Sequence, residues 1–145
     1  MAILNYTTSI NTEKTVSEIQ GVLAKAKAQT VLSEYDDNGI MVAMSFKIKT
    51  ASGFMAFRLP ANIEGVYQAL RRNRKIPSRL KTYEQASRVS WRILKDWIEA
   101  QLAIVEAEMV DMEEVFLPYA QNESGQTLYE VIKGNGFKQL TMHST

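Results

Sequence analysis

The sequence contains no cysteine and only one histidine in 145 residues. Without cysteine the chain cannot form disulfides, thiolate metal sites or a thiol nucleophile. The single histidine, His143, lies at the C-terminal end, so the familiar Ser-His catalytic arrangements find no support. P-loop, GxGxxG, HExxH and nucleophile-elbow motifs are also absent from the sequence. We therefore predict no catalytic residues, no metal ligands and no cofactor, and we do not expect an enzyme.

Long apolar runs are absent as well. No segment approaches the roughly 20 apolar residues that span a bilayer, and residues 1–10 lack the regions of a signal peptide. The hydrophobic content of 46% and charged content of 23% are ordinary for a globular protein. We expect a soluble cytoplasmic protein with no membrane partner. Its length predicts a single domain at residues 1–137, followed by a flexible tail at 138–145.

Strand patterns predict a small antiparallel sheet. Residues 2–9 are expected to form a short N-terminal strand, and residues 30–35 are rich in β-forming side chains. Asn38-Gly39 is a strong hairpin signal, and residues 40–48 after it alternate between apolar and polar side chains. A further turn leads into the run FMAFRLP at residues 54–60. We expect a meander of three antiparallel strands plus the N-terminal strand.

Helical patterns complete an α+β fold. Thr15–Glu18 and Thr82–Gln85 both match the capping-box pattern, and Asn62 can cap a helix between them. The helix that begins after Thr82 is predicted to span about residues 83–109. It has apolar residues on two sides, as a central helix or a subunit interface would require, and we expect a homo-oligomer. The predicted architecture packs the helices on one face of the sheet.

Charge is sorted sharply along the chain, although the formal net charge is only +1. Residues 71–97 contain nine Lys or Arg and two acids, whereas residues 97–131 contain eight acids and no Lys or Arg. Along the long helix the cations precede the carboxylates, which opposes the helix dipole by roughly 0.3–1 kcal/mol per charge. Local helix energetics therefore do not account for this order. An anion bound near Arg88 and Arg92 would be stabilised by the side chains and the dipole together.

The predicted anion-binding patch covers residues 71–95. Its cations are Arg71, Arg72, Arg74, Lys75, Arg79, Lys81, Arg88, Arg92 and Lys95. The same charge pattern would also arise if the acidic segment folded back and neutralised the patch, or if basic and acidic segments paired between subunits. The sequence leaves both of these alternatives open.

Nucleic acid is the first candidate for the anion, because clustered Lys and Arg side chains are the usual footprint of phosphate binding. Tyr83, Trp91 and Phe54 or Phe57 are aromatic residues suited to base stacking, although helical spacing also favours a core position for Trp91. The alternative is a phosphorylated ligand, such as a nucleotide or cyclic nucleotide, in a pocket. That pocket would consist of Arg58, Arg92, Lys95, Tyr119 and Tyr129. A further alternative is inhibition of a host enzyme through the acidic residues 99–114.

The segments FRLPAN, WRILKDWIEAQLAIVEAE, VFLPYA and TLYE together resemble a group of small, largely uncharacterised proteins of tailed phages and prophages. The similarity covers roughly residues 10–130. No established activity attaches to that group, so the resemblance implies no catalytic residues. It implies a phage origin, the cytoplasm of a bacterial host as location, and a role in replication, recombination or blocking of host defence. The prediction is a non-catalytic, phage-type anion-binding protein, with a nucleic-acid-binding replication or recombination accessory protein as first choice.

Overall fold

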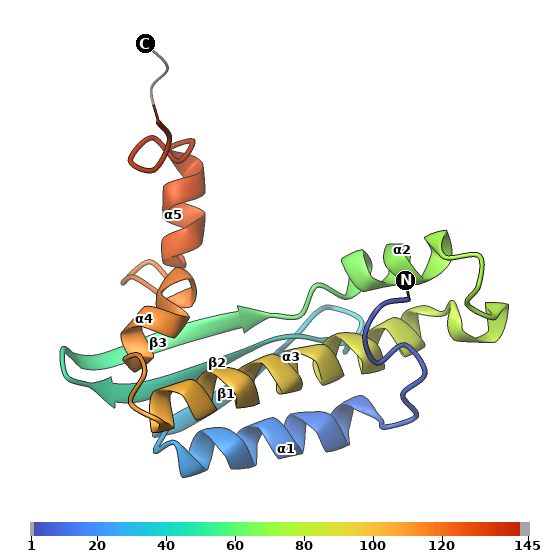
Figure 1. Cartoon of the computed structure of the whole chain (residues 1–145), viewed down its shortest axis with the longest axis horizontal. Helices are drawn as coiled ribbons and strands as arrows, with labels where there is room; N and C mark the ends of the chain where they lie inside the picture. The colour runs from blue at the N-terminus through green and yellow to red at the C-terminus, as the bar shows by residue number, and fades with distance from the viewer. Residues whose placement is uncertain (1, 143–145) are drawn as a thin grey trace.

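The structure is a computed structural model that describes residues 2–142 (Figure 1). Its elements are α1 (Thr12–Lys25), β1 (Thr30–Tyr35), β2 (Met41–Thr50), β3 (Gly53–Pro60), α2 (Ile63–Arg72), η1 (Ser78–Leu80), α3 (Tyr83–Glu106), α4 (Met112–Phe116), η2 (Leu117–Tyr119) and α5 (Leu128–Gly134). The α+β class, the three-stranded antiparallel meander and the long central helix are all confirmed. His143 and the end of the predicted tail lie outside the described residues.

The sheet has the order β1-β2-β3, and both pairings are antiparallel. The β1–β2 turn is built around Asp36, whose Oδ1 accepts the backbone N–H groups of Asn38 and Ile40, both at 2.9 Å. Gly39 adopts a φ of 78°, a left-handed conformation that glycine adopts without steric strain. This turn brings the end of β1 beside the start of β2, close to the N-terminal ends of α1 and α3 (Figure 1).

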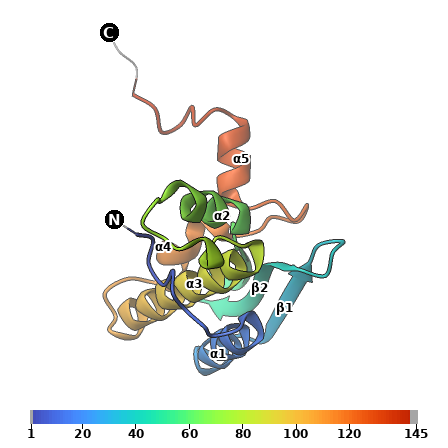
Figure 2. The ribbon, with the colours of Figure 1, turned by 90° about the vertical axis from the view of Figure 1, so that its right-hand side faces the viewer.

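One face of the sheet is covered by α1 and α3, which lie side by side (Figures 1 and 2). Phe46 and Phe57 on this face contact Phe116, with ring centroids 5.4 and 5.8 Å away from the Phe116 ring. Trp91 of α3 is fully buried, and its Nε1 donates to the carbonyl of Met41 at 3.3 Å. Trp91 is therefore a core residue and is not available for base stacking.

The N-terminal strand predicted at residues 2–9 is wrong. The backbone turns at Asn5, which has a φ of 64°, and the Thr8 N–H donates to the Asn5 carbonyl at 3.0 Å. The buried side chain of Gln85 then donates through Nε2 to the carbonyls of Tyr6 and Thr8, both at 2.9 Å. A side chain of α3 thus satisfies backbone groups that a strand would have paired within the sheet.

The ends of the helices follow the predictions only in part. Helix α1 begins at Thr12, one turn before the predicted start, because Asn11 accepts the Lys14 N–H at 2.8 Å, and Thr15 is buried within the helix. Asn62 caps α2 as predicted. Thr82 caps α3 through the Gln85 N–H, but the Gln85 side chain does not complete a capping box.

The C-terminal part of the chain extends away from the sheet (Figures 1 and 2). Helix α3 ends at Glu106, shortly before the predicted residue 109, because Glu108 takes a left-handed φ of 60°. Helix α5 begins with a capping box in which Thr127 and Glu130 bond each other's backbone N–H groups. None of the helices in residues 2–142 combines the length and the apolar character that a membrane crossing requires.

Candidate anion-binding surface

Arg88, one of the three predicted patch cations on α3, is bound to a neighbouring carboxylate. Its Nη2 lies 2.6 Å from Glu84, one turn earlier in the helix, and its Nη1 donates to the Gln85 side chain at 3.0 Å. An incoming phosphate would have to displace Glu84 before it could bind this guanidinium. Glu84 itself lies in the first turn of α3.

Arg92 and Lys95 are paired with α1. Arg92 donates to Glu18 at 2.7 Å, and Lys95 lies 3.7 Å from Glu18 and 2.7 Å from Glu99. The hydrogen bond from Arg92 lowers the pKa of the Glu18 carboxyl below its usual value, and the positive charges of Arg92 and Lys95 add to the effect. Both cations are mostly shielded from solvent, with 18% and 12% of their side-chain surface exposed. These pairs fasten α1 to α3.

The Glu18 carboxylate is expected to make the free energy of unfolding depend on pH. Because its pKa is lowered in the folded state, its contribution is present at neutral pH and is lost as pH falls through 4.5 and below. A Glu18→Gln variant should be less stable than wild type in urea at neutral pH, and the difference should shrink in acid. Glu123→Gln, at an exposed loop residue, serves as the control. Parallel pH profiles for wild type and Glu18→Gln would contradict this role.

The other six predicted cations lie at one end of the molecule, on the last turn of α2 and on the connection from α2 to α3. We call this group the basic corner; it consists of Arg71, Arg72, Arg74, Lys75, Arg79 and Lys81. Within residues 2–142, none of the six forms an ion pair. Lys81 is half-buried and the other five are exposed. The sequence patch therefore divides into three paired cations and six that remain available.

The backbone of the basic corner is held in place from beneath. Ile76 is buried, with 3% of its surface exposed, in a cluster with Ile63 and Leu70. The Asn73 side chain accepts the Lys75 N–H at 3.0 Å, and the Lys81 N–H donates to the Ser78 carbonyl. The cations therefore project from an anchored segment, so little backbone ordering has to accompany binding.

The acidic residues 99–114 lie at the other end of the molecule, on the last turns of α3 and on α4 (Figure 1). They therefore do not neutralise the basic corner within the chain. Among residues 2–142, Glu99 is the residue of this acidic segment that pairs with a patch cation, Lys95.

Next to the basic corner the surface forms an open cavity of about 800 Å³. Arg72, Arg74 and Lys75 line it, together with the N-terminal residues 2 and 3.

The residues of the predicted nucleotide pocket do not gather in one place. Arg92 and Lys95 line a groove between α1 and α3, whereas Tyr119 lines a separate cavity beside Trp97. Arg58 pairs with Glu34 across the sheet at 2.8 Å. Tyr129 lies on α5, where its ring packs near Phe137. The arrangement offers no shared binding site for a nucleotide at these five residues.

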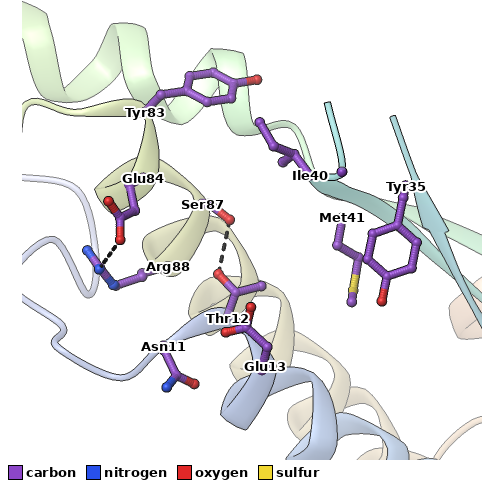
Figure 3. A pocket seen from close by; sticks show the side chains of 11 residues that line it. Asn11, Thr12, Glu13, Tyr35, Ile40, Met41, Tyr83, Glu84, Ser87 and Arg88 are labelled. Atoms are coloured by element: carbon purple, nitrogen blue, oxygen red, sulfur yellow. Dashed lines mark hydrogen bonds and ion pairs between the residues drawn. The ribbon is translucent and has the colours of Figure 1, made fainter. Parts of the chain in front are cut away.

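A cavity that sequence reasoning missed lies at the same end as the basic corner. It has a volume of about 410 Å³, opens to solvent, and is lined by the start of α1, the start of α3 and the β1–β2 hairpin (Figure 3). Tyr35 and Tyr83 lie at different edges of the cavity, and the hydroxyls of Thr12 and Ser87 bond each other at 3.0 Å within it. Of its lining residues, the sequence analysis singled out Tyr83, as an aromatic residue beside the basic patch, and Arg88, as a patch cation.

Comparison with protein-family models, curated proteins and solved structures finds no match to this chain, so its function has to be inferred from its own residues.

Proposed function

We propose that the protein binds nucleic acid without catalysis, through contacts between backbone phosphates and the basic corner. A phage-type accessory protein of replication or recombination is the role that we infer from this binding. One observation carries the proposal: six cations project from one end of the molecule and, within residues 2–142, meet no carboxylate. A cluster of like charge repels itself, so a partner of opposite charge would stabilise it.

The composition of the corner suits phosphate. Four of its six cations are arginines, at positions 71, 72, 74 and 79. A planar guanidinium can bind two phosphate oxygens at once, whereas an ammonium acts as a compact point charge. Several arginines on a fixed segment therefore favour a ligand with repeated phosphates over a single carboxylate.

The three cations of α3 are not part of the proposed interface. Arg92 and Lys95 are largely buried against Glu18, and Arg88 is bound to Glu84. Removing such a carboxylate from its cation would leave the carboxylate without a partner, which opposes recruitment of these side chains to a phosphate. The proposed interface is thus smaller than the patch that the sequence predicts.

Salt dependence tests the proposal directly. If about six phosphates are neutralised, the logarithm of the association constant should fall with log salt at a slope of about −5 for duplex DNA. Affinity for a labelled duplex should then drop about 1,000-fold between about 50 and 200 mM salt, as measured by fluorescence anisotropy. Negligible binding of both duplex and single strands at about 50 mM salt would reject the proposal. So would a binding constant that does not change with salt.

A further inference from the structure

The cavity between Tyr35 and Tyr83 is joined to the basic corner by a chain of aromatic contacts. The Arg71 guanidinium lies 5.6 Å from the centre of the Tyr67 ring. Tyr67 in turn meets Tyr83 edge-on, with centroids 5.6 Å apart and planes at 75°. A strand whose phosphates contact Arg71 would therefore have its bases within reach of the cavity.

The tyrosines present aromatic surface to solvent. Tyr35 is 60% exposed and Tyr83 is 36% exposed, although both line the cavity. Exposed aromatic rings beside a cationic surface are the usual stacking platform for unpaired bases, because every base has a flat π face. A continuous duplex keeps its bases stacked on one another and cannot offer such a face without unpairing.

The polar lining of the cavity does not suit a phosphate. Glu13 and Glu84 contribute two carboxylates, and the one arginine, Arg88, is already bound to Glu84. The group that enters should therefore be neutral and should donate hydrogen bonds. A nucleobase meets this requirement, while its phosphates remain outside on the corner.

Glu13 supplies a hydrogen-bond acceptor to the cavity wall. Within residues 2–142 its carboxylate makes no ion pair, and it lies in the first turn of α1 at the cavity wall (Figure 3). Adenine, cytosine and guanine carry an exocyclic amino group that can donate to a carboxylate, whereas thymine carries a carbonyl at the equivalent position. The Thr12 and Ser87 hydroxyls can rotate to donate or accept at the remaining base edge.

We propose that an unpaired base with an exocyclic amino group occupies the cavity, stacked on Tyr83 and Tyr35, while the adjacent phosphates contact the basic corner. This inference rests on the proposed function and narrows its preferred substrate to single-stranded nucleic acid, including unpaired strand ends. The cavity residues recognise the base, and the corner supplies affinity that is independent of sequence.

The test measures binding of three probes by fluorescence anisotropy: an oligothymidine strand, the same strand with several cytosines, and a duplex. Wild type should prefer the cytosine-containing strand about 5-fold over oligothymidine. A Tyr35→Ala/Tyr83→Ala variant should bind that strand about 5- to 20-fold more weakly, as loss of base stacking implies, and the duplex unchanged. The matched Tyr35→Phe/Tyr83→Phe variant keeps the rings and should resemble wild type.

A second test uses the variant Glu13→Gln, in which the changed residue is exposed. This variant should lose the preference for cytosine without any weakening of duplex binding. If all probes bind with steep salt dependence, but neither the tyrosines nor Glu13 affects the strand comparison, the base cavity is refuted and phosphate binding stands. Equal losses for strand and duplex in the alanine variant would also refute it. If no probe binds, the proposed function and this inference both fail.

Discussion

Replacement of all six basic-corner cations by glutamine is expected to weaken DNA binding at least about 100-fold at about 100 mM salt. The replaced residues are Arg71, Arg72, Arg74, Lys75, Arg79 and Lys81. Affinity is lost because each phosphate that a cation neutralises releases counterions, and the variant has no basic-corner cations to release them. Its salt slope should approach zero, as anisotropy titrations at several salt concentrations would show. The fold should persist, because within residues 2–142 these side chains form no ion pairs.

A control with the same change in net charge distinguishes a defined interface from general attraction. It replaces six exposed lysines elsewhere by glutamine, namely Lys14, Lys25, Lys27, Lys47, Lys49 and Lys133. These lysines lie on or next to α1, on the sheet and on α5, away from the α2–α3 connection. If this control loses as much affinity as the corner variant, binding depends on total charge and the corner is no interface.

Trp91→Ala is expected to lower the free energy of unfolding by about 3–5 kcal/mol. Trp91 has no exposed surface and is part of the hydrophobic core between α3 and the sheet. The substitution therefore leaves a cavity that neighbouring side chains can only partly fill. It also removes the hydrogen bond to the Met41 carbonyl. Urea unfolding followed by circular dichroism gives the measurement.

Trp97→Ala is the matched control for that loss. Trp97 lies on the same helix and touches Phe116 and Tyr119 edge-on, but it remains partly exposed. Its replacement should lower the free energy of unfolding by less than Trp91→Ala does, because less buried apolar surface is removed. If the two variants lose the same stability, Trp91 does not have the central packing role that its burial indicates.

The sheet and the long helix were predictable because their signals are local. Asn38-Gly39 marks the hairpin through backbone geometry alone, and the alternation after it follows from the two faces of a strand. The N-terminal segment carried no comparable signal. Its conformation depends on Gln85, which is far away in sequence but bonds the carbonyls of Tyr6 and Thr8. The strand propensity of residues 2–9 could not reveal that contact.

In the candidate site, too, features set by neighbouring residues were predictable, and features set by packing between distant elements were not. The basic corner was visible because its cations are neighbours in sequence and the connection between two helices keeps them together. The pairing of Arg92 and Lys95 with Glu18 was not visible, because it depends on how α1 packs against α3. The cavity was missed for a similar reason: Tyr35 and Tyr83 line the same cavity only when the hairpin lies beside both helix starts.

The order of the strands also has a consequence for how the chain folds during synthesis. Each strand pairs with its neighbour in sequence, so the sheet can form as soon as residues 30–60 leave the ribosome. The side of that sheet that carries Phe46 and Phe57 nevertheless stays only partly covered until α3, at Tyr83–Glu106, has emerged and Phe116 of α4, which contacts both rings, has followed it. We expect a nascent chain that stops before α3 to be prone to aggregation, and the core to be complete only when Phe116 has also emerged.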